Sequence, residues 1–196
     1  GLDMASNPIC PIARGRRVCH SYYKRPAAQT DFENFVAHNG SLLPVPGRDI
    51  MVQGFYQGGI TVFDWTDPKK PFEMAYFDRG PLDGTRLLSA GSWSVYWYNG
   101  LIYSSEISRG LDIYEMVPTP HLSQNEIDAA KTVTFHEANA QDQRKIVWPP
   151  SFAMAKQVVE PLERSTGIAA GHIPRSPSTI PRPVRHPGAH TQQAAE

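Results

Sequence analysis

The sequence predicts a mainly-β fold made of about two blades of a β-propeller-like repeat, with a short helical C-terminal extension and disordered tails. Three observations support this prediction. A segment recurs after 51 positions, both copies are rich in β-branched and aromatic residues, and prolines crowd the end of the chain. A four-stranded propeller blade repeats every 40 to 50 residues or so, which matches the offset.

The internal repeat aligns residues 50–64 (IMVQGFYQGGITVFD) with residues 101–115 (LIYSSEISRGLDIYE) without a gap. Gly59 falls on Gly110, and the apolar residues that follow keep their type in the second copy. Glycine is typical of a turn between two strands. The repeat therefore predicts two equivalent hairpins.

The β-rich runs give the strand positions. Strands are expected at 41–46, 50–56, 60–65 and 72–77 in the first blade, and at 92–98, 101–106 and 111–117 in the second. Asn99-Gly100 lies between two of these runs and is a strong hairpin signal. A fourth strand is not obvious in the second blade, although 132–136 or 145–148 could supply an extended edge.

Two helices are expected after the repeats. Ser123 and Glu126 form a capping-box pattern that starts a short helix ending near Lys131. A second helix is expected over 151–164, with Phe152, Ala155, Val159 and Leu162 on its apolar face. Pro161 lies inside this helix and is expected to kink or end it.

These patterns divide the chain into four parts. They are a poorly ordered N-terminal segment (1–31), the propeller-like repeats (32–120), a helical extension (121–167) and a disordered Pro-rich tail (168–196). The last 25 residues contain five prolines and no aromatic residue. They cannot bury enough apolar surface to offset the conformational entropy that the chain loses on ordering, so this segment is expected to be disordered.

The chain has no net charge, because 19 basic residues balance 19 acidic ones, but the charges are unevenly placed. Residues 1–31 and 172–196 together carry eight basic and three acidic side chains, so the middle of the chain is acidic. An acidic body argues against nucleic acid as the main partner. No apolar run approaches the roughly 18 residues of a transmembrane segment, and the first residues lack a signal-peptide pattern.

The first copy of the repeat carries a recognisable motif. In residues 58–68 (GGITVFDWTDP) a β-rich run ends in aspartate, Asp-Pro follows, and Pro71 lies just beyond. Accompanying motifs are HNG at 38–40, PGRD at 46–49, FDRG at 77–80, YWYNG at 96–100 and LSQNEI at 122–127. From Phe35 to about Leu162 the chain resembles LVIVD-repeat proteins, predicted bacterial β-propellers that are often exported.

This resemblance implies a β-propeller fold, other propeller blades as packing partners and an extracellular or cell-envelope location. The LVIVD-repeat family has no established general activity, so the resemblance implies no catalytic residue. The sequence itself lacks the common catalytic and phosphate-binding motifs, and His136-Glu137 lacks the second histidine of a zinc-binding helix. No cofactor or metal is therefore expected.

Several polar and aromatic residues are candidates for binding a ligand. They are His38, Arg48, Asp49, Trp93, Trp97, Glu106 and Arg109. For most of them a structural role is favoured over ligand binding. His38 is expected to form a hydrogen bond between blades, and the tryptophans are expected to pack in the core. Arg79 and Arg109, with the acidic residues near them, are expected at the surface or in ion pairs between blades.

The leading hypothesis is a non-enzymatic binding or scaffold protein whose partners are other blades or another protein. The alternative is a hydrolase or lyase with a polar or metal site at the channel mouth, built around His38, Asp49 and Glu106. About two blades cannot cover all their own faces, so an open apolar face and self-association are expected.

The two cysteines, Cys10 and Cys19, are nine residues apart. An oxidising compartment would permit a disulfide bond between them. The favoured interpretation is that they are unpaired or loosely paired loop residues.

Overall fold

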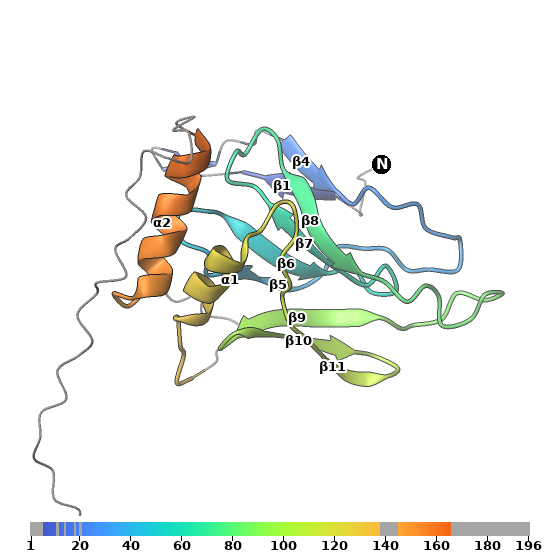
Figure 1. Ribbon diagram of the computed structural model, residues 1–196. Helices are drawn as coiled ribbons and strands as arrows, with labels where there is room; N and C mark the ends of the chain where they lie inside the picture. The colour runs from blue at the N-terminus through green and yellow to red at the C-terminus, as the bar shows by residue number, and fades with distance from the viewer. Residues whose placement is uncertain are drawn as a thin grey trace, which may run out of the picture. The chain divides into compact units, whose positions relative to one another are not determined.

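The computed structural model describes residues 6–10, 12–13, 15–17, 19, 21–137 and 145–165. Within these residues the chain is mainly β, with eleven strands in antiparallel sheets and two helices (Figure 1). The chain divides into two compact units, Gly1–Val159 and Glu160–Glu196, and nearly all the described residues belong to the first. The predicted tail at 168–196 lies outside the described residues.

Two antiparallel sheets form the body of the first unit. The first sheet contains β5 (Gly40–Leu43), β6 (Ile50–Gly54), β7 (Ile60–Asp64) and β8 (Phe72–Phe77), side by side in chain order. The second sheet contains β9 (Ser92–Tyr98), β10 (Leu101–Glu106) and β11 (Gly110–Tyr114), in the order β11-β10-β9. All seven strands lie where the sequence predicts them, with ends that differ by a few residues.

The turn between β9 and β10 has the backbone that its sequence demands. Asn99 has a φ of 47° and Gly100 a φ of 93°, and a two-residue hairpin turn of this hand needs positive φ at both positions. Asparagine and glycine tolerate this conformation better than other residues. The hairpin predicted from Asn99-Gly100 is confirmed.

The internal repeat is confirmed as two hairpins with one register. In the first, Met51 pairs with Phe63, and adding 51 to each gives Ile102 and Tyr114, which pair in the second. Gly59 and its equivalent Gly110 both have positive φ, of 78° and 97°. The same spacing of apolar residues and glycine therefore produces the same strand pairing twice.

The first sheet is covered on both faces, and all five residues of β7 are buried. On one face, which we call its front face, Ile50, Val52, Ile60 and Val62 belong to the main core together with Val95, Trp97 and Ile102 of the second sheet. On the other face, the back face, Phe63 packs with residues of the N-terminal segment. The second sheet thus packs on the front of the first.

The N-terminal segment, for which the sequence predicts poor order, contains four short strands among its described residues. They are β1 (Ser6–Ile9), β2 (Ile12–Ala13), β3 (Arg16–Arg17) and β4 (Ser21–Lys24), which pair as β1-β4 and β2-β3. Tyr23 of β4 is buried, and its ring stacks on Phe63 with a centroid distance of 4.0 Å. This contact joins the segment to the back face of the first sheet.

Cys10 and Cys19 form a disulfide bond, so the favoured interpretation of unpaired or loosely paired cysteines is wrong and the alternative, a disulfide, is present. The strand pairs explain the error. Ile9 lies opposite Ser21 in one pair and Ile12 opposite Arg17 in the next, so the residues between the pairs meet although they are nine apart in sequence.

Helix α1 (Gln124–Lys131) begins as predicted, with the capping box of Ser123 and Glu126 complete. The helix expected over 151–164 is present as α2 (Phe152–Ser165), and it does not end at Pro161. A proline removes one backbone hydrogen bond, and the helix continues for four residues beyond that loss. The described segments 132–136 and 145–148 form no strand; Val133 and Trp148 instead pack against the main core.

Of the expected apolar face of α2, the described side chains are exposed: Phe152 is 70% exposed, and Ala155 and Val159 are exposed as well, while Leu162 lies outside the described side chains. The helix instead turns Gln157 inward, and its amide donates a hydrogen bond to the carbonyl of Pro46 (3.1 Å). Neither α1 nor the described part of α2 has the length and apolar character needed to cross a membrane.

Candidate functional site

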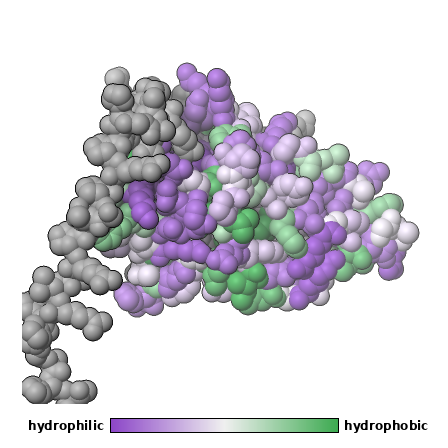
Figure 2. Space-filling view, viewed as in Figure 1, coloured by the Kyte–Doolittle hydropathy of each residue, from purple (hydrophilic) through white to green (hydrophobic). Residues whose placement is uncertain are grey.

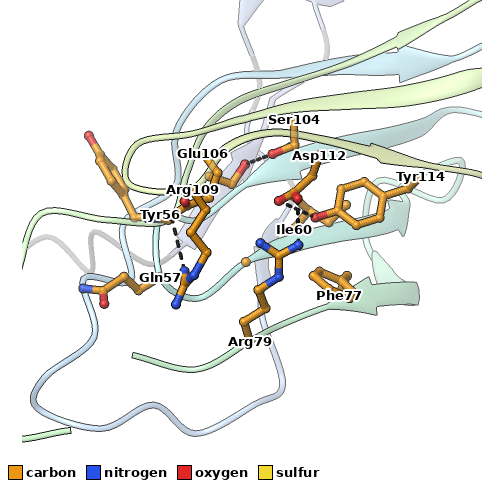
Figure 3. Close-up of a pocket in the computed structure, with 13 residues that line it drawn as sticks. Tyr56, Gln57, Ile60, Phe77, Arg79, Ser104, Glu106, Arg109, Asp112 and Tyr114 are labelled. Atoms are coloured by element: carbon orange, nitrogen blue, oxygen red, sulfur yellow. Dashed lines mark hydrogen bonds and ion pairs between the residues drawn. The ribbon is translucent and has the colours of Figure 1, made fainter. Parts of the chain in front are cut away.

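A cleft lies between the two sheets, on the side where their equivalent hairpins turn (Figure 3). The labelled side chains that line it are Tyr56, Gln57, Ile60, Phe77, Arg79, Ser104, Glu106, Arg109, Asp112 and Tyr114. Among the described residues, this cleft is the best candidate for a site, because it gathers four charged side chains from separate segments.

One ion pair crosses the cleft from one sheet to the other. Arg79, which follows β8, donates to an Asp112 oxygen of β11 (2.7 Å), and the Tyr114 hydroxyl donates to the other oxygen (3.1 Å). Hydrogen bonding to Asp112 raises the pKa of Arg79, and burial raises the pKa of Tyr114 above its ordinary value. Of the two expectations for Arg79, a surface position or an ion pair, the structure shows an ion pair, which joins the two sheets.

A second ion pair shapes the turn after β10. Glu106 is buried and accepts hydrogen bonds from the backbone N–H groups of Gly91 (2.5 Å) and Ser108 (3.2 Å). Arg109 reaches the same carboxylate at 3.4 Å. Because two backbone groups and a guanidinium bind Glu106, its carboxylate holds the turn rather than facing open space.

Three aromatic rings meet beside the cleft. His38 lies 4.3 Å from Trp93 and 5.1 Å from Tyr56 between ring centroids, and Tyr56 meets Trp93 edge-on at 5.6 Å. The ring Nδ1 of His38 forms a hydrogen bond with the backbone carbonyl of Trp93, and the backbone N–H of His38 donates to the carbonyl of Gly54 (2.9 Å). His38 thus forms a structural hydrogen bond of the kind that the sequence analysis expects, here to the first strand of the second sheet.

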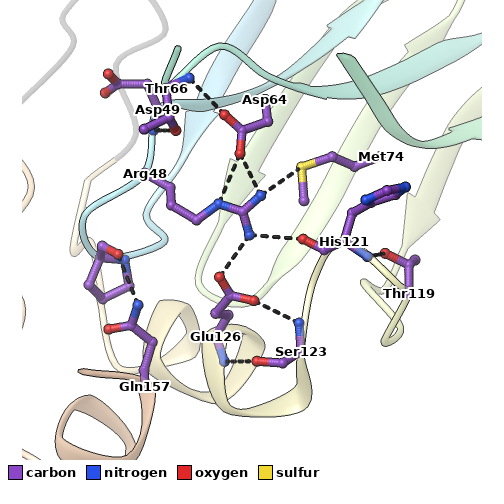
Figure 4. Close-up of polar contacts among 11 residues, drawn as sticks. Arg48, Asp49, Asp64, Thr66, Met74, Thr119, His121, Ser123, Glu126 and Gln157 are labelled. Atoms are coloured by element: carbon purple, nitrogen blue, oxygen red, sulfur yellow. Dashed lines mark hydrogen bonds and ion pairs between the residues drawn. The ribbon is translucent and has the colours of Figure 1, made fainter. Parts of the chain in front are cut away.

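Arg48 lies in a separate polar network, at the other end of β6 (Figure 4). Its guanidinium donates to Asp64 (2.9 Å), to Glu126 (2.7 Å) and to the carbonyl of His121 (2.9 Å). Burial acts to lower the pKa of Arg48, but hydrogen bonds with Glu126 and Asp64 outweigh it and raise the pKa. Arg48 thereby connects the end of β7 with α1 and the loop before it.

The remaining sequence-predicted residues lie apart from the cleft. Trp97 is buried in the main core. Asp49 is exposed, and its backbone N–H donates to the hydroxyl of Thr66 (2.9 Å). Of the seven candidates, Glu106 and Arg109 line the cleft, His38 and Trp93 lie beside it, and Arg48, Asp49 and Trp97 lie elsewhere.

The trio His38, Asp49 and Glu106 does not converge. Asp49 and His38 lie at opposite ends of β6. Asp49 directly precedes its first residue, whereas the backbone N–H of His38 donates to the carbonyl of Gly54, its last residue. Five residues of β-strand span about 16 Å, which separates Asp49 from His38. Within the described residues, no group of three or more His, Cys, Asp or Glu side chains is placed to hold a metal ion.

The sequence analysis did not single out Asp112, Tyr114 or Tyr56 as site residues. The repeat contains a signal for the first two, because Asp112 and Tyr114 are equivalent to Thr61 and Phe63. Those residues lie on the back face of the first sheet, toward the preceding layer. For Tyr56 the sequence offers no such signal; it has a positive φ of 50° in the β6–β7 turn.

Comparisons with known proteins give no match: no family model, curated protein or solved structure is similar to this chain.

Proposed function

We propose that this chain is a non-enzymatic binding or scaffold module, built from β-propeller-type blades like those of the LVIVD-repeat proteins. The four charged side chains of the cleft carry the proposal, because they pair with one another: Arg79 with Asp112, and Arg109 with Glu106. A catalytic acid, base or nucleophile must instead point at a shared reacting atom.

The alternative, a hydrolase or lyase built around His38, Asp49 and Glu106, receives less support. It needs the three side chains in one pocket, and Asp49 lies at the opposite end of β6 from His38. His38 and Glu106 both hold backbone groups of the β9 region, His38 through Trp93 and Glu106 through Gly91. These contacts favour structural roles, in which His38 joins the two sheets and Glu106 holds the turns of the second sheet.

The blade assignment is supported by the arrangement of the sheets. Each sheet has antiparallel strands in chain order, and the second sheet packs on the front face of the first. The equivalent hairpins of the two sheets also have the same strand register. Propellers repeat such sheets around an axis. We also propose a location outside the cytoplasm, since disulfide bonds such as Cys10–Cys19 persist in oxidising compartments.

A substrate screen tests this function. The wild-type protein is assayed with ester, lactone, phosphoester and glycoside substrates beside His38→Ala, with Asp49→Asn as a control for a residue outside the cleft. We expect no turnover that depends on His38, and a lower melting temperature for His38→Ala. Turnover that disappears in His38→Ala while circular dichroism shows an intact fold would favour the enzyme instead.

A further inference from the structure

β11 is an edge strand with apolar side chains in contact with solvent. Among the described strands it pairs with β10 alone, because the second sheet has the order β11-β10-β9 (Figure 1). Leu111 is 63% exposed and Ile113 is 56% exposed. Phe77 of β8, whose ring contacts that of Tyr114 of β11, is 38% exposed. Figure 2 shows hydrophobic residues gathered over β10 and β11. An open sheet edge therefore lies beside exposed apolar side chains.

The internal repeat shows what occupies the equivalent edge of the first sheet. The strand equivalent to β11 is β7, and β8 pairs with β7 on the side away from β6. Adding 51 to the bounds of β8, 72 and 77, gives 123 and 128, which are the N-cap of α1 and a residue within that helix. The segment equivalent to β8 therefore forms a helix, and the second sheet has three strands where the first has four.

The backbone of β11 presents hydrogen-bonding groups at this edge. In the first hairpin the N–H of Phe55 donates to the carbonyl of Gly59 (2.8 Å). Facing residues of antiparallel strands alternate between bonded and unbonded pairs, so Val62 directs its N–H and C=O groups away from β6 and toward β8. The second hairpin has the same register. Its equivalent residue, Ile113, therefore directs its N–H and C=O groups to the open edge.

β11 lacks the features that protect sheet edges from further pairing. Prolines, bulges and charged side chains keep an edge strand from accepting another strand. β8, the edge strand of the first sheet that contacts β11, follows Pro71 and has a bulge. β11 has no proline and no bulge, and its one charged side chain, Asp112, is paired with Arg79. The backbone of β11 can therefore accept a strand.

We propose that β11 binds an extended segment of another protein, which adds antiparallel to β11 as the fourth strand of the second sheet, as β8 adds to β7. This proposal rests on the proposed function, because it names the kind of partner that the binding module takes. Strand addition provides affinity through main-chain hydrogen bonds and specificity through alternate side chains. The partner needs apolar side chains opposite Leu111 and Ile113, because the equivalent residues of β7 lie opposite apolar residues of β8.

Charge favours a basic residue at the start of the added strand. Asp64 of β7 lies opposite Phe72, the first residue of β8, so the first residue of the partner strand would lie opposite Glu115. The side chain of Glu115 is 60% exposed, and one of its oxygens pairs with Lys131. The middle of the chain, which holds both sheets, is acidic and attracts a basic segment.

Residues 174–196 of the chain do not suit this strand themselves. Between Pro174 and Pro187 no proline-free run exceeds three residues. A proline cannot donate to a strand ladder, so this sequence cannot form the regular pairing that β8 forms. The partner strand is therefore assigned to another protein.

A synthetic peptide with the β8 sequence, residues 70–78 (KPFEMAYFD), is the probe, because β8 makes the equivalent contact in the first sheet. We expect it to bind the full-length chain with a dissociation constant below about 1 mM, measured by fluorescence anisotropy. Ile113→Pro removes the N–H at the open edge and should weaken binding about tenfold or more. Ile113→Val keeps that N–H and should bind as wild type does. Proline is tolerated in an edge strand where the N–H faces solvent, and circular dichroism verifies that both variants are folded.

N-methylated peptides test the register of the added strand. Ala75 of the peptide should lie opposite Ile113 with its N–H bonded to β11, whereas the N–H of Tyr76 should point away. Methylation of the Ala75 nitrogen should weaken binding about tenfold, and methylation of the Tyr76 nitrogen less than about twofold. A peptide with Phe72→Lys should bind several times more tightly than one with Phe72→Glu, because this residue lies opposite Glu115.

Several results would overturn the proposal. They are no binding at about 1 mM peptide, binding that Ile113→Pro leaves unchanged, and equal effects of the two methylations. Binding that appears only after residues 166–196 are deleted would identify the end of the chain itself as the occupant. Sedimentation of the full chain as a dimer that Ile113→Pro abolishes would identify a second copy. None of these results concerns catalysis, so the non-enzymatic function would stand. Conversely, turnover that depends on His38 would contradict the proposed function without changing peptide binding.

Discussion

Arg48 illustrates how a charged residue that resembles a ligand contact holds the fold instead. Its guanidinium bonds to Asp64 at the end of β7, to Glu126 of α1 and to the carbonyl of His121. Only 19% of the side chain is exposed, and both carboxylates are nearly buried. Removing the arginine would leave two buried carboxylates without their cation, which costs more than the loss of a surface ion pair.

We therefore expect Arg48→Ala to lower the free energy of unfolding by about 2–4 kcal/mol. Arg86→Ala is the control, because Arg86 pairs with Asp83 at the surface. Its effect should stay below about 1 kcal/mol. Chemical denaturation of the three proteins measures both values. Equal losses for the two variants would show that the Arg48 network adds no more than a surface pair.

Tyr23 gives the stability of the protein a dependence on alkaline pH. Its hydroxyl lies 2.8 Å from the hydroxyl of Thr61 and donates to Glu73 at 3.1 Å. Burial raises the pKa of Tyr23 well above its ordinary value near 10. The unfolded chain therefore loses this proton at a lower pH than the folded chain, and stability falls as the pH rises above 10.

Tyr23→Phe removes this titration. Between pH 9 and pH 11, we expect the free energy of unfolding to fall about 1 kcal/mol less in Tyr23→Phe than in wild type. The raised pKa of Tyr114 is present in both proteins and cancels in the difference. Denaturation at several pH values provides the test, and parallel curves for the two proteins would refute the assignment.

At the scale of the elements, the equivalent hairpins differ in how tightly their turn glycines are packed. A Cβ on Gly59 would lie 2.1 Å from the carbonyl oxygen of Phe77, whereas a Cβ on Gly110 would have no neighbour within 4 Å. Both positions have positive φ, so alanine is strained at either. Only at Gly59 does a steric clash with the backbone add to that strain.

The two alanine variants should therefore separate. We expect Gly110→Ala to lower the free energy of unfolding by about 1–2 kcal/mol through backbone strain alone. Gly59→Ala should cost about 3 kcal/mol or more, because the turn must also move away from β8. Thermal and chemical denaturation of both variants measure the difference. Equal costs would mean that β8 moves aside freely.

The elements set by local signals could be predicted from the sequence. Asn99-Gly100 specifies its own turn, Ser123 specifies the start of α1, and the glycine and apolar spacing of the repeat specify the paired hairpins. Each of these signals lies within a few residues of the structure that it produces. Predicting these elements therefore required no knowledge of the tertiary fold.

The features that depend on distant segments could not be predicted. The Cys10–Cys19 bond needs the strand pairs on either side of it, and the partners of Arg48 lie 16 and 78 residues away. In α2 the apolar pattern suggested a buried face, but among the side chains described in this helix the buried one is Gln157, whose amide bonds to the distant Pro46. In the cleft, the Arg79–Asp112 pair joins residues 33 apart that lie on different sheets.

At the scale of the whole first unit, three layers are stacked: the β1-β4 pair, the first sheet and the second sheet. The first sheet lies in the middle, and its two faces belong to two different apolar cores. Phe63 of β7 packs on one side and Val62 on the other, so adjacent residues of one strand link the layers. A loss of packing on the back face should therefore weaken the front as well.

The adjacent tyrosines of β4 test this coupling. Tyr23 is 2% exposed and stacks on Phe63, whereas Tyr22 is 60% exposed. Truncating a buried aromatic side chain costs about 3–5 kcal/mol, so Tyr23→Ala should lower the free energy of unfolding by that amount, while Tyr22→Ala should change it by less than about 0.5 kcal/mol.

Amide hydrogen exchange shows where in the structure this stability is lost. If the layers unfold together, Tyr23→Ala should speed amide exchange in β7 and in β10 by similar factors. This would hold even though Tyr23 shares a core with Phe63 of β7 and with no residue of β10. Faster exchange confined to 6–24 would instead mean that the N-terminal layer opens alone, and that the two sheets form the cooperative unit without it.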